Sequence, residues 1–276
     1  MKKYGFIGYG NIGSMLVSGF LDNNFLEPEQ IVLSNRTQSK LKKPKNKWPQ
    51  VNIVNSNKEL AKESSYIFIC VEPLDIKDVL NEIKNDIKKS DHIISVAAGV
   101  TLSDIEASLP EKTMITKVIP SVTSRVNIGV SLICHNSLVN DSQNKEINDL
   151  FNTIGNTKII KETNFEAAAD ATNPGFLAFI LEKYTESLSN MNHHDLTKKE
   201  IEELVTITLY GMINMVIKNK NSLSNITSMV ATEGGITEQG VNLLESELGL
   251  VFDELFISTF KKHDKIKKII KEQFYL

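Results

Sequence analysis

YGFIGYGNIG, at residues 4–13, is the stretch that decides the fold of this chain. It opens on an apolar run typical of a buried strand, and its last six residues match the pattern GxGxxG. The segment NIGSMLVSGFLDNN that follows has apolar residues at Ile12, Leu16, Val17 and Phe20, the stripe of a helix that covers a sheet. A glycine-rich turn between such a strand and such a helix predicts a dinucleotide-binding unit.

Each glycine of the pattern has a separate steric role. Gly8 permits the tight turn, Gly10 lets a pyrophosphate approach the backbone, and Gly13 lets helix and strand pack closely. The free N–H groups and the positive dipole end of the helix favour a phosphate. We therefore predict that the cofactor is bound by the whole turn: Gly8, Tyr9, Gly10, Asn11, Ile12 and Gly13.

The end of the second predicted strand distinguishes NADPH from NADH. An enzyme that uses NADH places a carboxylate there, to accept a hydrogen bond from the ribose 2′-hydroxyl. This chain has Ser34, Asn35 and Arg36 instead. Because a guanidinium binds phosphate with a fork of donors, these three residues favour the 2′-phosphate of NADPH. The alternative is that Arg36 is a surface charge near a helix start.

Two further loops follow predicted strands, at the sheet edge where ligands of such sheets bind. Val71, Glu72 and Pro73 follow the fourth strand, and a run of small residues, 97–99, follows the fifth. Small residues leave room for a flat ring, so the spacing predicts a nicotinamide channel. The predicted contacts in these loops are Val71, Pro73, Ala97, Ala98 and Gly99.

Strands and helices alternate over residues 1–160, which predicts an α/β fold with a Rossmann-type, doubly wound parallel sheet. The predicted strands are 4–8, 31–35, 51–54, 66–71, 92–97, 113–119 and 130–134. Residues 161–276 form a second, all-α domain with no convincing strand from Asn164 onward. Its predicted helices are 165–188, interrupted near Pro174, then 198–218, 237–248 and 252–274. These helices carry more apolar surface than one copy of this domain has room to bury. We therefore expect a homodimer in which the C-terminal helices of two copies pack together.

Composition excludes several classes of protein. Apolar residues make up 41% of the 276 residues and charged residues 24%, and the net charge of −3 gives no reason to expect a nucleic-acid partner. Apolar runs are too short for a membrane helix. The first strand begins too early for a signal peptide, so we expect a cytoplasmic protein. Cys70 and Cys134 do not make a disulfide framework, and the neighbouring pair His193 and His194 does not predict a metal site.

Basic residues gather near the C-terminus and predict a solvated helix face or, as the alternative, a docking patch for an acidic partner. They are Lys261, Lys262, Lys265, Lys267, Lys268 and Lys271.

Taken together, the motifs resemble the pyrroline-5-carboxylate reductase family over nearly the whole chain. The likeness is carried by GYGNIG (8–13), SNR (34–36), VEP (71–73), SVAAG (95–99), VIPS (118–121), NPGF (173–176) and TEGGITEQGVNLLE (232–245). The last resembles the SPGGTT signature near that family's substrate. Details of VEPLDI, VIPSVTSR and EGGITEQG look most similar to the late-competence, ComER-like branch.

The resemblance implies reduction of the cyclic imine 1-pyrroline-5-carboxylate to L-proline with NADPH, or more weakly with NADH. It also implies a C-terminal dimerisation domain, often assembled into larger rings. Thr237, the family's retained threonine, becomes the expected catalytic donor to the substrate. The expected substrate-binding residues are Thr172, Thr232, Gly234, Gly235 and Thr237. The alternative for the last four is a plain turn between two helices.

The chain departs from the family's pattern near the substrate, at Glu72, Ser121, Asn173 and Glu233. A carboxylate at Glu233 would repel a substrate carboxylate unless it faces away or pairs with a cation. Two hypotheses therefore stand, an NADPH-dependent imine reductase and a cofactor-binding paralogue with a regulatory role. A β-hydroxyacid dehydrogenase is a weaker third, because Lys183 lacks the glycine-rich turn that its catalytic lysine would follow.

Overall fold

The computed structural model describes residues 1–191 and 195–275. The chain forms two compact units. The first, here called the sheet unit, comprises Met1–Thr172 together with Phe260–Leu276, and the second, here called the helical unit, comprises Asn173–Thr259. The division at residue 160 that the sequence suggests stays a prediction about domain organisation.

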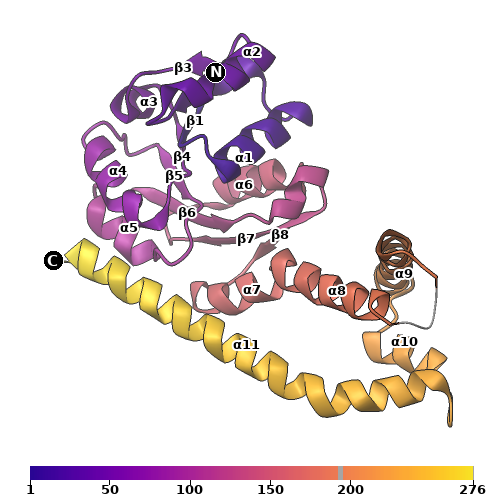
Figure 1. The fold of residues 1–276 in the computed structure, drawn as a ribbon. Helices are drawn as coiled ribbons and strands as arrows, with labels where there is room; N and C mark the ends of the chain where they lie inside the picture. Colours follow the sequence, from indigo (N-terminus) through magenta and orange to yellow (C-terminus); the bar gives the residue numbers. More distant parts are fainter. Residues whose placement is uncertain (192–194, 276) are drawn as a thin grey trace. The chain divides into compact units, whose positions relative to one another are not determined.

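One eight-stranded sheet organises the sheet unit, in the order β3-β2-β1-β4-β5-β6-β7-β8 (Figure 1). Neighbouring strands run parallel except β6 and β7, which are antiparallel. The sheet is therefore mixed, and the prediction of an all-parallel sheet is wrong at this pair. The strands are β1 (Tyr4–Ile7), β2 (Ile31–Ser34), β3 (Asn52–Ile53), β4 (Tyr66–Ile69), β5 (His92–Ser95), β6 (Met114–Ile119), β7 (Gly129–His135) and β8 (Gly155–Ile159).

All seven predicted strands are present; six are one or two residues shorter than expected, and β7 is one residue longer at each end. The eighth, β8, was not predicted. It lies at the edge of the sheet, and its sequence GNTKI is only partly buried. Because an edge strand with one wet face needs no continuous apolar run, its sequence does not stand out from a loop.

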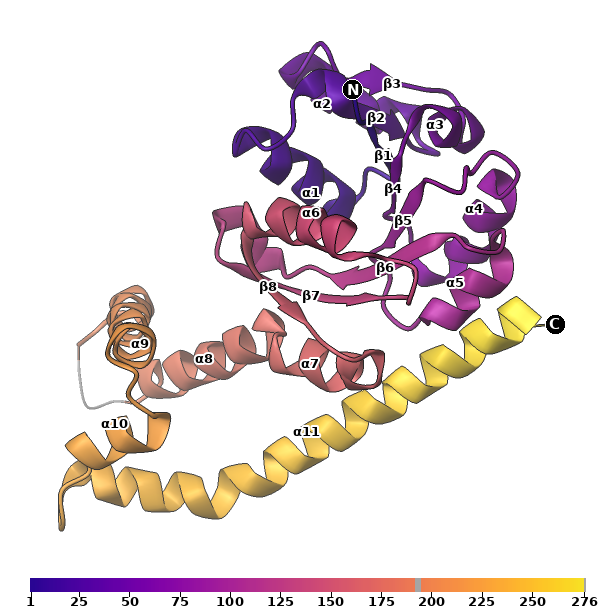
Figure 2. The same ribbon diagram turned by 180° about the vertical axis from the view of Figure 1, so that it is seen from behind.

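Helices cover both faces of the sheet (Figures 1 and 2). On one face lie α1 (Asn11–Asp22) and α6 (Asp141–Asn152), and on the other α3 (Asn57–Glu63), α4 (Ile76–Ile83) and α5 (Leu102–Ser108). The remaining elements are α2 (Lys42–Lys47), α7 (Phe165–Ala171) and the 3₁₀ turns η1 (Pro28–Gln30), η2 (Gln38–Leu41), η3 (Pro73–Asp75), η4 (Val122–Val126) and η5 (Glu162–Asn164).

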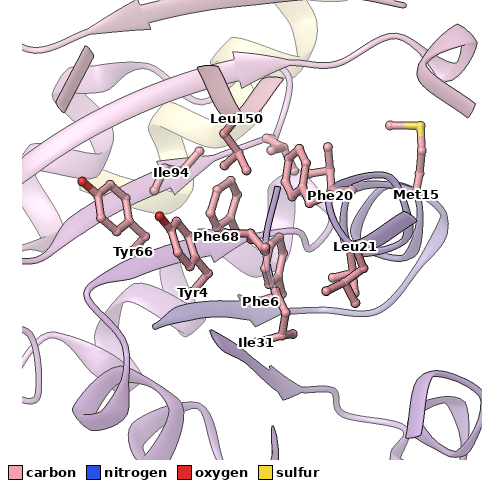
Figure 3. Close-up of a cluster of buried hydrophobic side chains, with 14 of the residues drawn as sticks. Tyr4, Phe6, Met15, Phe20, Leu21, Ile31, Tyr66, Phe68, Ile94 and Leu150 are labelled. Atoms are coloured by element: carbon pink, nitrogen blue, oxygen red, sulfur yellow. The ribbon is translucent and has the colours of Figure 1, made fainter. Parts of the chain in front are cut away.

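Aromatic side chains fill the core beneath α1 (Figure 3). Phe6 on β1 lies opposite Phe68 on β4, and their rings stack at 4.5 Å between centroids. Phe20 from α1 meets Phe151 from α6 edge to face at 5.5 Å. These four side chains are fully buried. They fix α1, and with it the glycine turn, to the centre of the sheet.

The helical unit holds α8 (Pro174–Ser189), α9 (Lys198–Asn219), α10 (Leu223–Val230) and the first part of α11 (Ile236–Tyr275). The predicted break near Pro174 is confirmed, since α7 ends at Ala171 and Asn173 caps α8 by accepting from the Gly175 N–H. The short, partly polar α10 was not predicted.

Residues 237–274 were predicted as two helices, and this is wrong, because α11 is continuous. Gly249 lies between the two predicted segments. A helical glycine costs about 1 kcal/mol relative to alanine but leaves every backbone hydrogen bond intact, so it weakens a helix without ending it. Among the described residues, no helix combines the length and apolar character needed to cross a membrane.

Candidate functional site

The turn between β1 and α1 has glycines where larger side chains cannot fit. Gly8 has a φ of +98°, and a Cβ there would lie 2.5 Å from the carbonyl oxygen of Cys70. A Cβ on Gly13 would lie 2.1 Å from the carbonyl oxygen of Gly8. A Cβ on Gly10 would meet no atom within 4 Å. The first and third glycines are thus required by packing, whereas the second keeps the approach to the backbone open.

The N-terminus of α1 is available to an anion. Gly10 is the N-cap, no side chain caps the helix, and no acidic residue lies in its first turn. Asn11 and Ile12 are exposed in that turn. Because the first N–H groups of a helix lack intrahelical partners and carry the positive end of its dipole, this terminus suits a phosphate.

Tyr9 and Asn35 lock the turn to the end of β2. The Tyr9 N–H donates to Asn35 Oδ1 at 2.8 Å, and Asn35 Nδ2 donates to the Thr37 carbonyl at 2.8 Å. The Tyr9 ring is buried in the core, and burial raises the pKa of its hydroxyl. Tyr9 therefore shapes the turn, and its N–H is already engaged.

A cavity of about 610 Å³ opens beside this turn, at the carboxyl ends of β1, β2 and β4. Six of the predicted cofactor residues line it: Gly8, Gly10, Ser34, Asn35, Arg36 and Val71. The other predicted cofactor residues lie outside its lining, and they are Tyr9, Asn11, Ile12, Gly13, Pro73, Ala97, Ala98 and Gly99.

Two consecutive hydrogen bonds join three polar side chains along one wall of this cavity, and the sequence did not predict them. The Ser34 hydroxyl donates to Asn57 Oδ1 at 2.8 Å, and Asn57 Nδ2 donates to Glu82 Oε2 at 2.7 Å. Asn57 begins α3 directly after its N-cap Ser56. That capping pattern was the available signal, because helices that follow parallel strands begin at the same edge of the sheet.

Arg36 lies at the rim of the cavity with its side chain 89% exposed. Its guanidinium is 3.8 Å from Asp75 Oδ2. An exposed pair at this separation is worth at most ~1 kcal/mol, so Arg36 can turn toward a ligand at little cost. The wall formed by η3 and α4 is acidic, because Glu72, Asp75, Asp78 and Glu82 all line it.

The loop after β5 lies apart from the cavity lining. Ala97 is buried in the core, Ala98 is exposed, and Gly99 has a φ of +80°. Pro73 starts η3 directly after Glu72, which is exposed.

The predicted substrate loop lies in the helical unit, as a turn between α10 and α11. Gly235 N–H donates to the Thr232 carbonyl at 2.8 Å, and Gly234 N–H donates to Glu238 Oε2 at 2.8 Å. Thr232, Glu233 and Thr237 are exposed. Both glycine N–H groups therefore have partners within the chain, one of them a carboxylate.

Thr172 belongs to the sheet unit, and its hydroxyl donates to the Ala168 carbonyl at 2.8 Å. Ser121 caps η4 by accepting from the Thr123 N–H at 3.3 Å. Lys183, considered for a different reductase chemistry, pairs with Glu186 at 2.7 Å on the surface of α8.

Within residues 1–191 and 195–275, no group of histidine, cysteine or acidic residues is arranged to hold a metal ion. His193 and His194 lie outside the described residues. Both cysteines are free, and burial raises the pKa of the Cys70 thiol and raises that of Cys134 to about 11. Neither thiol is poised to react as a nucleophile.

Two family models match separate parts of the chain. Residues 3–99 match one described as NADP oxidoreductase coenzyme F420-dependent, and residues 162–266 match one described as pyrroline-5-carboxylate reductase dimerisation. The first contains the glycine turn and the lining of the cavity, and the second contains the loop 232–237.

Similar proteins match over nearly the full length. ComE operon protein 4 of Bacillus subtilis is 28% identical over 276 residues, covering 99% of this chain and all of that protein. Pyrroline-5-carboxylate reductase 3 of the same organism is 29% identical with the same coverage. The crystal structure of Plasmodium falciparum pyrroline carboxylate reductase with NADP bound superposes with a TM-score of 0.81 at 26% identity, covering 97% of each chain.

Proposed function

This chain belongs to the pyrroline-5-carboxylate reductase family, and from that premise we propose that it reduces the cyclic imine 1-pyrroline-5-carboxylate to L-proline with NADPH. The proposal rests first on one observation: the turn 8–13 packs so tightly that Gly8 and Gly13 cannot carry a Cβ, while the approach to Gly10 stays open. That geometry, with an uncapped helix behind it, fits the pyrophosphate of a dinucleotide.

NADPH is the preferred nucleotide in this proposal. The residues after β2 include no carboxylate to read a 2′-hydroxyl, and Arg36 lies exposed at the rim of the cavity. The similar Plasmodium protein was crystallised with NADP. The acidic wall opposes a 2′-phosphate, so Arg36 must leave Asp75 and turn to that phosphate for the preference to hold.

A bound reduced nicotinamide would supply the hydride for the imine carbon. The protein must then hold the substrate carboxylate and place a donor near the nitrogen as it becomes an amine. We assign the donor to the exposed hydroxyl of Thr237, in the first turn of α11. Thr232, and Gly234 once its N–H is released from Glu238, would bind the carboxylate.

A homodimer is part of the proposal. Among the described residues on the helices of the helical unit, only Thr185 and Ile201 are buried. Leu204, Ile207 and Tyr210 instead form an apolar stripe along α9, with Ile207 69% and Tyr210 72% exposed. A second copy of the chain is the fitting occupant, because the family model that covers these helices is one of dimerisation.

The second candidate is a ComER-like paralogue that binds NADPH, has a regulatory or competence-related role and turns over weakly or not at all. Three carboxylates favour it. Glu238 accepts the hydrogen bond from the Gly234 N–H, Glu233 precedes Gly234 in the chain, and Glu72 lines the cavity. The near-equal identity to ComE operon protein 4 is compatible with this alternative.

Initial rates with the purified full-length protein test the two candidates. NADPH and NADH oxidation would be followed with and without 1-pyrroline-5-carboxylate, and nucleotide binding would be titrated in parallel. We expect substrate-dependent oxidation with a lower KM for NADPH than for NADH. Tight NADPH binding without substrate-dependent oxidation would contradict the reductase and favour the paralogue.

A further inference from the structure

The C-terminal part of α11, residues 260–275, belongs to the sheet unit and is here called the C-terminal brace. Ile266, Ile270 and Phe274 follow one another at a spacing of four and join the core cluster that contains Ala97 and Val100. Ile270 is fully buried. The dimerisation model ends at residue 266, so much of this contact lies beyond the part of the chain that it matches.

The C-terminal brace contacts the loop that follows β5. A Cβ on Gly99 would lie 2.8 Å from Ile266 Cγ2 and 3.1 Å from Ile270 Cδ1. The loop therefore packs directly against the helix, with no space for a side chain at Gly99. Figures 1 and 2 both show the C-terminal end of α11 beside α5, which starts just after this loop.

A second set of contacts ties the brace to the loop that follows β4. Gln273 Nε2 donates to the Leu74 carbonyl at 2.6 Å, and Lys77 Nζ donates to the Gln273 carbonyl. Leu74 lies in η3, between Glu72 and Asp75, and both acids line the cavity. One helical segment thus contacts both loops at the carboxyl ends of β4 and β5.

An ion pair and a histidine–carboxylate contact fix the other side of the brace to α7. Lys267 Nζ lies 2.7 Å from Glu166 Oε1, and His263 Nε2 lies 3.2 Å from Asp170 Oδ1. Burial opposes ionisation of Glu166, yet the hydrogen bond from Lys267 holds its pKa below the usual range. Lys267 is the exception in the predicted basic helix face, since Lys268 and Lys271 are exposed.

We propose that the C-terminal brace positions the loops 72–75 and 97–99 for the dinucleotide, with Gln273 and Ile266 as positioning residues. This inference rests on the proposed function. A loop ordered before binding loses less conformational entropy when the ligand arrives, so bracing raises affinity without touching the ligand. The brace thus acts on cofactor affinity, and the hydride transfer step is unaffected once the cofactor is bound.

Gln273→Ala in the full-length protein tests this role, because it removes the bond to the Leu74 carbonyl at a partly exposed site. The Kd of NADPH should rise about 3- to 10-fold, the size of one net hydrogen bond or slightly more. With substrate present, KM for NADPH should rise while kcat at saturating NADPH stays unchanged, whereas a loss of folded protein would lower kcat alone. Lys268→Ala and Lys271→Ala are the matched controls and should bind as the native chain does.

Hydrogen exchange on the dinucleotide-free protein provides a second readout. The backbone N–H groups of Glu72, Leu74 and Asp75 and of residues 97–99 should exchange faster in Gln273→Ala and in Ile266→Ala than in either lysine control. Native affinity and native exchange in both brace variants would overturn the brace alone. A native chain that binds neither NADPH nor NADH would overturn the proposed function and the brace together.

Discussion

The two compact units of this chain differ in where their apolar side chains lie. In the sheet unit, Phe6, Phe20 and Phe68 are fully buried among residues of the same chain. In the helical unit, Ile207, Tyr210 and Leu250 are 69%, 72% and 73% exposed. Both units draw on similar residue types, so composition does not explain the difference.

The contrast shows which of the two units buries its apolar side chains within a single chain. A sheet with helices on both faces closes its own core, and the same strands that build that core position the glycine turn. In a single copy, the helices of the second unit leave apolar stripes exposed to water. Each large side chain left exposed forgoes a burial free energy of about 1.5–3 kcal/mol. The cavity beside the glycine turn therefore forms within one copy, whereas in the proposed homodimer a second copy would cover the exposed stripes of the helical unit.

The largest expected effect comes from a charge placed on the exposed stripe of α9. Ile207→Asp should weaken dimer association by on the order of a hundredfold or more, because a twofold interface carries the change twice. Light scattering should report at least twice the 30.9 kDa of one chain for the native protein, and one chain for the variant. Glu202→Gln, an exposed position on the same helix, should leave the mass unchanged. A dimer that survives Ile207→Asp would place the interface elsewhere.

Thr237→Val asks whether the helical unit also contributes chemistry. Loss of a hydroxyl that bonds the reacting group lowers turnover by about 10²-fold. Valine keeps the shape of threonine, so NADPH affinity and dimer mass should both stay native. Steady-state rates beside a nucleotide titration would check this. Native turnover in the variant would mean that the loop 232–237 is a plain turn.

A pair of glycine variants sharpens the contrast from the side of the sheet unit. Gly13→Ala forces a Cβ against the Gly8 carbonyl and should lower stability by about 1–3 kcal/mol together with NADPH affinity. Gly10→Ala meets no atom within 4 Å, so it should lower NADPH affinity while stability stays native. Urea unfolding and a nucleotide titration on both variants separate the two effects. Equal stability losses would contradict the packing argument.

Acid should destabilise the sheet unit through His92. Burial lowers the pKa of His92 to about 3, and burial lowers that of His135 in the same direction. Between about pH 6.5 and 3 the unfolded chain therefore binds a proton that the folded chain does not, so stability falls as pH falls, by up to ~1.4 kcal/mol per pH unit for His92. Urea midpoints at pH 7 and pH 5.5 should differ less in His92→Asn. If the urea midpoint fell as much between pH 7 and pH 5.5 in that variant as in the native chain, His92 would not be the source of the acid destabilisation.

The smallest effect expected in this comparison of the two units concerns the choice of nucleotide. Arg36→Ala should weaken NADPH binding about tenfold, or 1.4 kcal/mol, and leave NADH binding nearly unchanged. Asp75→Asn should change NADPH affinity in the opposite direction, because it releases Arg36 from its partner. Calorimetry with both nucleotides measures each value. If the native chain bound NADPH and NADH with equal affinity, Arg36 would not be the residue that recognises the 2′-phosphate.

Much of the sheet unit could be predicted because its signals are local. An apolar strand, a glycine turn and a striped helix lie next to one another in residues 4–20, and each requires particular residue types there. The edge strand β8 and the short α10 have weak signals, because neither needs a continuous apolar run. The single helix α11 was missed because Gly249 lowers helix propensity without ending a helix.

The site was harder to predict than the fold, because its details depend on contacts between distant residues. Sequence alone does not reveal that Glu82 supports Ser34 through Asn57, or that Gln273 reaches Leu74. Each partner lies on another turn or another element, where spacing in the sequence gives no guide.

Product stoichiometry tests the proposed reductase most directly. Purified dimer would be mixed with NADPH and 1-pyrroline-5-carboxylate, and L-proline would be quantified beside the NADPH consumed. A reductase built from a complete cofactor cavity and a partner-completed helical unit should form one L-proline for each NADPH oxidised. A dimer that binds NADPH yet forms no L-proline would contradict this function and leave the chain as a cofactor-binding paralogue.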